Sequence, residues 1–473
     1  MDLMRFTRAM KIGPPRAAVL VLAAMALLAR RPFPAAAEVT ISRAALVTIT
    51  DTTAVLTWET DRPADTVVRC GTRSGRLDQV VSSDRPVRFH YAELRGLQPG
   101  TRYYYLCQSG SARASTSDLS PGRFTTLAPP PGRELFSFAT MTDTHVGERQ
   151  VARLVLSPGK VVSQGVRWPD PNVPFWQLAV GSSIEEINDR PVAFTIIKGD
   201  VTHGNDASEF PLAKRLLDRL KRPYRIVRGN HDRLGPLLRT FELPRPYYSF
   251  DHEGVHFVVL DTEPLAVESA GAALETQLAW LAGDLREHLQ QWTFVFVHRP
   301  IPPRLSRGYG PLSDRIFKAQ RDLAMKLYGP KAARLLTAVS GRTPCVHVPH
   351  ARRLTGMLRN HGRIAGVFAG HLHRNYLGRW PEQTGNLPYV ETAATKEYPC
   401  GYAVTRVFTG GYMQSFYTPR DPHCLEWSAM SADAYAGIGW PDKAGPLSDR
   451  NFVVCYRDLR GEQSGLAASG RTR

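Results

Sequence analysis

The 473-residue sequence lacks several features that would define a function class at once. No C-x-x-C pair occurs among its six cysteines, so a zinc ribbon or a thioredoxin-type redox site is not supported. No block of five or six like charges occurs either, although Lys and Arg total 60 against 43 Asp and Glu. The net charge of +17 suits anionic partners, whether phosphate esters, nucleic acid or an anionic surface, and does not choose among them. Because the charge is spread along the chain, a nucleic-acid-binding tail is not expected.

The sequence also lacks an apolar run long enough to cross a bilayer comfortably. Its longest run, residues 17–29, has 13 residues. Four basic residues precede this run and Ala35-Ala36-Ala37 follows it, as in a secretory signal peptide that is cut after Ala37. We therefore expect residues 1–37 to be removed, and the mature chain to be periplasmic or secreted without a transmembrane helix. An uncleaved N-terminal anchor is the alternative, because Arg30 and Arg31 separate the apolar run from the cleavage site.

Residues 38–127 alternate apolar and polar side chains, which predicts β-strands at 53–60, 66–70 and 103–108. Trp58 lies where a β-sandwich places a buried ring. The turn Leu97-Gln98-Pro99-Gly100 leads into Tyr103-Tyr104-Tyr105, and this pattern resembles the fibronectin type III signature. The resemblance implies an all-β sandwich in which one of these tyrosines makes a corner hydrogen bond. It also brings the strands of Cys70 and Cys107 near one another, which allows a disulfide between them.

A proline-rich linker, residues 128–133, leads to a second domain at 134–420. There, short apolar runs alternate with helical stretches, which predicts an α/β layered domain. We expect strands at residues 135–139, 192–197, 224–227, 255–260, 293–297 and 364–368. We expect helices at residues 176–188, 207–220, 274–288, 313–327 and 350–360, and a β-hairpin formed by 402–408 and 412–417. A C-terminal extension, residues 421–473, shows no clear period and is expected to be partly disordered.

Polar side chains follow five of these predicted strands at the point where each strand ends. They are Asp143 and His145, Asp200, the run Asn230-His231-Asp232, His298, and the pair His371 and His373. Ligands bind at the carboxyl ends of strands in open α/β sheets, so we expect these side chains to lie together. Carboxylates, an amide oxygen and imidazoles favour two transition-metal ions over calcium, and Asp200 is the natural bridging residue. Gly199, Gly229 and Gly370 would allow sharp turns after the strands.

This ordered set of motifs resembles the calcineurin-like metallophosphoesterase superfamily. The matching motifs are Asp143-x-His145, Gly199-Asp200, Gly229-Asn230-His231-Asp232, Val297-His298 and Gly370-His371-x-His373. The resemblance implies a four-layer α/β/β/α sandwich that holds two divalent or trivalent ions of manganese, iron or zinc, or a mixed pair. A β-sandwich in front of such a domain also resembles the N-terminal part of purple acid phosphatases.

The resemblance further implies a role for each residue. The first metal takes Asp143, His145, Asp200 and His373, and the second takes Asp200, Asn230, His298 and His371. A hydroxide that bridges the metals attacks phosphorus, and His231 acts as the general acid that protonates the leaving oxygen. Asp232 falls on the acid that orients His231.

Three further features carry weaker predictions. His203 occupies the position of the iron-binding tyrosine of purple acid phosphatases, so no tyrosinate–iron centre is expected. His203 and Arg299 are candidates for substrate contact, with a solvated loop position as the alternative for His203 and an ordinary surface position as the alternative for Arg299. Cys345-x-His347-x-x-His350 has the spacing of a metal cluster, but we expect it to form part of the pocket rim.

These features predict an exported, metal-dependent phosphoric ester hydrolase with a small phosphate ester as substrate and no nucleic-acid partner. The choice between monoesters and diesters stays open, and a cyclic-nucleotide phosphodiesterase is one alternative. A catalytically inactive binding protein with this fold is the other alternative, although every ligand position is filled and His231 is present. The sequence does not predict the oligomeric state.

Overall fold

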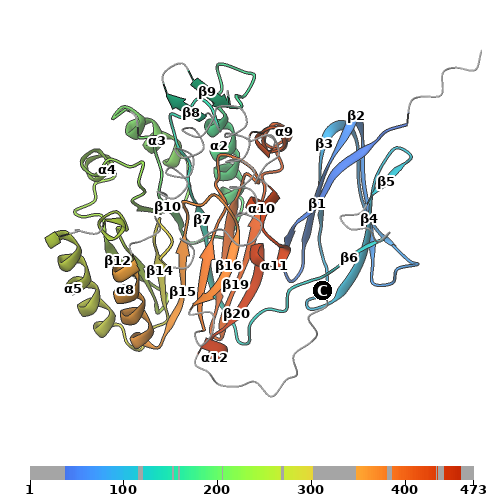
Figure 1. Cartoon of the computed structure of the whole chain (residues 1–473). Helices are drawn as coiled ribbons and strands as arrows, with labels where there is room; N and C mark the ends of the chain where they lie inside the picture. The colour runs from blue at the N-terminus through green and yellow to red at the C-terminus, as the bar shows by residue number, and fades with distance from the viewer. Residues whose placement is uncertain are drawn as a thin grey trace, which may run out of the picture.

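A computed structural model describes most of the chain (Figure 1). The described residues are 38–114, 121–151, 154–157, 160–163, 165–204, 206–267, 271–301, 348–380, 386–432, 434 and 441–459. The expected signal peptide, the helix expected at 313–327, Cys345, His347 and residues 460–473 lie outside them. None of the helices formed by the described residues is both long and apolar enough to span a membrane.

The N-terminal domain is a β-structure built from strands that lie beside the C-terminal part of the chain (Figure 1). Its strands are β1 (Ile41–Ile49), β2 (Ala54–Gly71), β3 (Gln79–Leu94), β4 (Arg102–Ser109), β5 (Ala112–Ala114) and β6 (Gly122–Thr125). The two strands expected at 53–60 and 66–70 are parts of the single long strand β2. The pairing of β2 with β3 shifts register between Glu59 and Thr66, which lets both strands bend around their core.

The core of this domain confirms two expectations. Trp58 is 3% exposed, stacks on His90 with ring centroids 4.8 Å apart, and donates its indole N–H to Ser109 Oγ at 2.9 Å. The backbone N–H of Gln98 donates to the Tyr103 hydroxyl oxygen at 2.9 Å. Tyr103 therefore makes the expected corner hydrogen bond, which fixes the turn that precedes β4.

We expect Tyr103→Phe to lower the free energy of unfolding by about 1 kcal/mol, because the Gln98 N–H loses its acceptor in a partly buried turn. Denaturant unfolding followed by tryptophan fluorescence measures this change. Tyr104→Phe, one position along the same strand, is the matched control. An equal effect of both substitutions would contradict a specific role for Tyr103.

The disulfide that the sequence allows between Cys70 and Cys107 does not form, since both residues carry free, buried thiols in the structure. Across β2 and β4, Cys70 pairs with Tyr105 and Cys107 pairs with Val68. The two cysteines are therefore diagonal rather than directly opposite. Diagonal positions on a sheet are about 7 Å apart, whereas a disulfide needs Cβ atoms about 3.8 Å apart.

The second domain contains two six-stranded sheets. The first has the order β11 (Tyr224–Val227), β10 (Thr195–Lys198), β7 (Glu134–Met141), β18 (Tyr402–Phe408), β19 (Gly411–Tyr417) and β20 (Asn451–Cys455). The second has the order β12 (Tyr248–His252), β13 (Val255–Val259), β14 (Thr293–Phe296), β15 (Ile364–Ala369), β17 (Leu387–Glu391) and β16 (Tyr376–Trp380). A separate hairpin pairs β8 (Leu154–Ser157) with β9 (Lys160–Ser163). The expected hairpin is β18 and β19, which pair antiparallel.

Three apolar clusters define the layers. Helices α2 (Phe175–Asn188) and α3 (Glu209–Leu217) pack on the outer face of the first sheet. Helices α5 (Gly271–Glu287) and α8 (Val348–His361) pack on the outer face of the second sheet. An aromatic core that includes Phe138, Phe257, Phe294 and Tyr412 fills the space between the sheets. The expected α/β/β/α sandwich is therefore confirmed.

The described part of the C-terminal extension is ordered and adds to this domain. It forms α9 (Pro422–Ala432), α10 (Pro441–Ala444), α11 (Leu447–Arg450), β20 and α12 (Tyr456–Leu459). Phe452 and Val454 of β20 enter the core between the two sheets. The sequence showed no element here because β20 is short and, among the described strands, pairs only with the distant strand β19. The remaining short helices are α4 (Leu234–Thr240) and the 3₁₀ turn η1 (Pro264–Ala266).

Candidate metal centre

The carboxyl ends of five strands bring the candidate ligands together. Strands β7, β10 and β11 run parallel in the first sheet, and β14 and β15 run parallel in the second. Five candidate ligands have left-handed backbone conformations, with φ between 42° and 70°; they are Asp143, His145, Asp200, His371 and His373. Such conformations cost of order 1–3 kcal/mol each in non-glycine residues and concentrate at functional sites.

Two glycines in the motifs are required by close packing rather than by their backbone angles. A Cβ atom on Gly229 would lie 2.1 Å from the Asp200 nitrogen, and one on Gly370 would lie 2.1 Å from Thr142 Oγ1. Of the three motif glycines, only Gly199 has a left-handed φ, at 87°. The expectation of a sharp turn therefore holds for Gly199, while the other two let neighbouring ligand loops touch.

The first group of donor atoms comes from Asp143, His145 and His373, which could hold one ion together. His373 Nε2 lies 3.1 Å from Asp143 Oδ1, and His145 Nε2 lies 4.0 Å from the same oxygen. The second group comes from Asp200, His298 and His371. Asn230 joins it, because its Oδ1 lies 3.1 Å from His298 Nε2.

Asp200 connects the two groups. Its Oδ2 atom lies 3.5 Å from His145 Nε2 and 3.2 Å from His298 Nε2. One carboxylate thus faces a histidine from each group. This is the arrangement that a bridging ligand of a two-metal site requires.

The donor atoms of this centre fit metal ions. Among the described residues, His145 Nε2 is buried and has no hydrogen-bond partner, although it lies 4.0 Å from Asp143 Oδ1 and 3.5 Å from Asp200 Oδ2. An unpaired buried nitrogen is costly, so its place beside two carboxylates points to a bound cation. His298 donates its Nδ1–H to the Lys198 carbonyl at 2.8 Å, which leaves Nε2 directed at Asp200.

Comparisons with known proteins agree with this geometry. Residues 136–375 match the family described as calcineurin-like phosphoesterase. The chain belongs to this family. Residues 41–126 match the N-terminal domain of purple acid phosphatase. The expected resemblance and the expected class of metal-dependent phosphoester hydrolase are both confirmed at the level of the family.

Curated relatives of this phosphoesterase-family chain match over shorter stretches. A glycerophosphodiester phosphodiesterase of Enterobacter lignolyticus is 26% identical over 142 residues, which cover 28% of this chain and 51% of the relative. A probable glycerophosphodiester phosphodiesterase of Arcobacter nitrofigilis is 28% identical over 115 residues, with 22% and 41% covered. The chain thus spans about half or less of the length of the curated relatives it matches.

Solved structures were also compared with this phosphoesterase-family chain. A dimetal phosphatase from Danio rerio has a TM-score of 0.43 and 13% identity, with 60% of this chain and 96% of that chain covered. A purple acid phosphatase from yellow lupin (Lupinus luteus) seeds has a TM-score of 0.40 and 12% identity, with 81% and 73% covered.

Burial and neighbouring charges raise the pKa of two histidines of the centre and lower the pKa of a third. Burial would lower the pKa of His298, but the nearby Asp200 carboxylate outweighs it and raises this pKa to about 9. Burial also opposes the charged form of His373, but Asp143 and Glu397 raise its pKa. At His371, burial, His298 and Arg299 together lower the pKa to about 3. The metal-free centre therefore favours a proton on His298 at neutral pH and disfavours one on His371.

We expect metal binding to this centre to release protons. His298, with a pKa of about 9 in the metal-free chain, must lose its proton before Nε2 can bind a metal ion. The apparent affinity for Mn²⁺ should therefore rise as the pH rises toward 9, by about tenfold per pH unit for each displaced proton, and level off above it. Calorimetric titration in buffers of different ionisation enthalpy measures the protons released. An affinity independent of pH from 7 to 9 would contradict the expectation.

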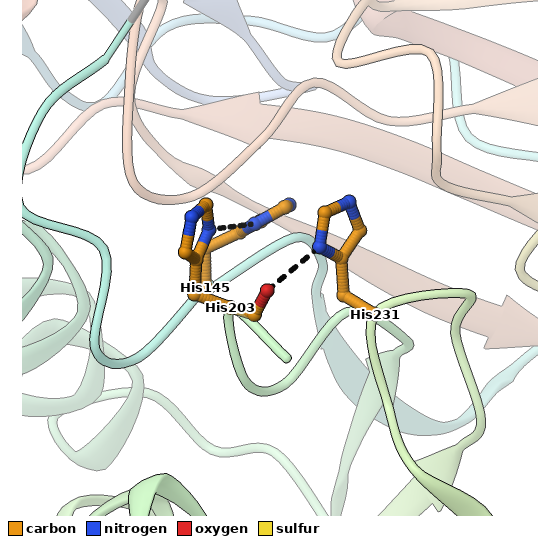
Figure 2. Close-up of side chains that lie close together, drawn as sticks. All are labelled: His145, His203 and His231. Carbon is orange, nitrogen blue, oxygen red and sulfur yellow. Dashed lines mark hydrogen bonds between the residues drawn. The ribbon is translucent and has the colours of Figure 1, made fainter. Parts of the chain in front are cut away.

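His231 and His203 lie beside His145 of the first group (Figure 2). His231 donates its Nδ1–H to the His203 carbonyl at 2.8 Å, and His203 Nδ1 lies 3.4 Å from His145 Nδ1. The rings of His145 and His231 are 4.7 Å apart between centroids. His231 is half-buried.

Asp232 does not hold the His231 ring as expected. Its carboxylate accepts hydrogen bonds from the backbone N–H groups of Val201, Thr202 and Gly229 at 3.2, 3.0 and 2.9 Å. The His203 carbonyl takes the orienting place instead. Burial and the Asp200 charge raise the pKa of Asp232 to about 6. Asp232 ties the loop after β10 to the loop after β11.

Arg299 reaches the second donor group but is also paired. Its guanidinium contacts Glu263 at 2.6 Å and His371 Nε2 at 3.3 Å. Glu263 thus restrains Arg299, which the sequence suggested for phosphate contact.

His350, the described member of the expected rim cluster, bonds through Nδ1 to the Leu265 carbonyl at 3.3 Å.

The sequence reasoning missed four charged residues around the first group; they are Glu148, Lys396, Glu397 and Lys443. Glu397 Oε1 accepts a hydrogen bond from His373 Nδ1 at 2.8 Å. Lys396 and Glu397 follow β17, which runs parallel to β15 in the same sheet. If β17 had been predicted, the expectation that functional side chains follow the carboxyl ends of strands would have included this pair as well.

Proposed function

We propose that this chain hydrolyses phosphate esters at a binuclear metal centre. The observation that carries the proposal is the position of Asp200 Oδ2, which lies within 3.5 Å of a histidine nitrogen from each donor group. Asp143, His145, Asp200 and His373 would hold the first ion. Asp200, Asn230, His298 and His371 would hold the second.

The bound ions would offset the charge of the phosphate and lower the pKa of a water molecule, which supplies the nucleophile near neutral pH. Residues of the chain would supply the proton for the leaving oxygen and a further contact to the phosphate. The carbonyl of His203 fixes the Nδ1–H of His231, so that Nε2 can carry a proton toward the leaving oxygen. We assign His231 as the general acid on this basis. Arg299, held by Glu263, lies where it can contact a phosphate oxygen bound near His371.

We propose phosphodiesters as the substrate class and phosphomonoesters as the alternative. The names of the two curated relatives support this choice, since both are glycerophosphodiester phosphodiesterases or probable ones. A diester with an alkoxide leaving group also needs the proton that His231 can donate. Residues 1–37 support the further proposal that the chain is exported.

Hydrolysis of bis-p-nitrophenyl phosphate and p-nitrophenyl phosphate by the full chain tests the proposal. We expect turnover that requires Mn²⁺ or another transition metal, stops after chelation, and prefers the diester. Preference for the monoester would overturn the substrate class alone. Binding of two metal ions without turnover of either ester would favour the inactive binding protein instead.

A further inference from the structure

A buried chain of charges links the outer nitrogens of both histidines in the first donor group. Lys396 Nζ lies 2.5 Å from Glu148 Oε2 and 2.8 Å from Glu397 Oε2. Glu397 Oε1 accepts the Nδ1–H of His373 at 2.8 Å, and Glu148 Oε2 lies 4.0 Å from His145 Nδ1. The Glu148–Lys396–Glu397 bridge therefore hydrogen-bonds to His373 through Glu397, and its other end, Glu148, lies near His145.

This bridge is shielded from water. The side chains of Lys396 and Glu397 are each 3% exposed, and that of Glu148 is 10% exposed. A buried charge is tolerated only where it is paired, and here two carboxylates share the Lys396 ammonium. Lys443 of α10 adds a second ammonium, with Nζ 3.1 Å from Glu397 Oε1. Charges of opposite sign thus balance around Glu397.

The backbone of the bridge is fixed to neighbouring elements. The indole N–H of Trp427 in α9 donates to the Lys396 carbonyl at 2.6 Å. The N–H of Thr395 donates to the Thr142 carbonyl at 2.9 Å, next to Asp143. Helix α9 and the end of β7 therefore hold residues 395–397 in place. Such anchoring lets Glu397 fix the angle of the His373 ring rather than follow it.

The charge state of Glu397 agrees with this role. Lys396 Nζ lies 2.8 Å from Glu397 Oε2 and Lys443 Nζ lies 3.1 Å from Glu397 Oε1, so an ammonium group faces each carboxylate oxygen and favours the ionised form. A carboxylate that accepts the outer N–H of a ligand histidine fixes its tautomer and raises its basicity. Removal of such a partner typically weakens metal binding by about 10- to 100-fold.

We propose that Glu397, charge-balanced by Lys396 and Lys443, is a positioning residue that sets the metal affinity of the first donor group. The inference rests on the proposed binuclear function. It also gives the C-terminal segment a role in the centre, since Lys443 and the anchor Trp427 both come from beyond β19. Glu397 does not touch the substrate and acts through His373.

Titration of the metal-free full chain with Mn²⁺ tests the inference, with bound metal counted by elemental analysis and the coupled two-manganese state followed by electron paramagnetic resonance. We expect wild type to bind two equivalents. Glu397→Gln should keep one equivalent and bind the other about 10- to 100-fold more weakly, with the coupled signal and turnover restored by excess Mn²⁺. Lys443→Met should shift the same equivalent in the same direction by less.

Two further variants keep the result interpretable. Glu186→Gln is the matched control, because Glu186 is also buried and bonds to the Tyr402 hydroxyl and the Arg420 N–H, neither of which belongs to a candidate ligand. If Glu397→Gln does not fold, Glu397→Asp keeps the charge and should still weaken one equivalent. Two equivalents of unchanged affinity in the folded Glu397 variant would overturn the positioning role alone. Fewer than two equivalents in wild type would overturn the binuclear function and the positioning role with it.

Discussion

Replacement of Asp200 with Asn is expected to reduce phosphodiester hydrolysis by on the order of 10³-fold or more. Asp200 Oδ2 faces His145 of one donor group and His298 of the other, so the substitution removes the shared anionic ligand from both. Metal ions contribute several kcal/mol of transition-state stabilisation, and about 4 kcal/mol corresponds to 10³-fold in rate. The variant should also bind fewer than two equivalents of Mn²⁺, measured by elemental analysis.

Asp284→Asn is the matched control for this loss. Asp284 also contacts a buried histidine, with Oδ2 2.9 Å from His256 Nε2, but it lies on α5 outside both donor groups. We expect the control to keep full activity and both metal equivalents. Full activity of Asp200→Asn would contradict the bridging assignment, as would equal losses in the two variants.

Substitution of His231 with Ala is expected to lower kcat by about 10² to 10⁴-fold for a diester with an alkoxide leaving group. The effect should be much smaller for a p-nitrophenolate leaving group, because this anion departs without a proton. Metal content should not change, since the side-chain hydrogen bond of His231 goes to the His203 carbonyl and not to a candidate ligand. Steady-state kinetics on both ester types measure the difference.

His252→Ala removes a half-buried histidine of β12 that contacts Phe136 and Phe194, and serves as the control for loss of an imidazole. It should leave the rates on both esters unchanged. Equal losses on both esters in His231→Ala would point to phosphate binding rather than proton donation. A loss of bound metal would point to a ligand role instead.

The sequence predicted that the candidate ligands lie together because each of them follows a short strand that contains apolar residues. The ends of such strands can be predicted from the sequence, and the carboxyl ends of parallel strands lie at one edge of the sheet. Strand β17 was not predicted, because its five residues, Leu387–Glu391, include a proline and show only a weak strand pattern. Glu397 and Lys396 were missed together with that strand.

Contacts between distant segments account for the other differences. Asp232 was expected to orient its neighbour His231, but backbone N–H groups from the β10 loop reach its carboxylate instead. The pairing of Cys70 and Cys107 depended on the register between β2 and β4, which strand order alone does not determine. The order in the C-terminal extension depends on β19, some 40 residues earlier in the chain.

Turnover measured against bound metal tests the central claim most directly. Metal-free full chain would receive Mn²⁺ in steps, and hydrolysis of bis-p-nitrophenyl phosphate would be followed at each step. A centre in which Asp200 bridges two ions predicts that activity rises mainly with the second equivalent and is complete at two. Full activity at one equivalent, or turnover in the metal-free chain, would contradict the binuclear account.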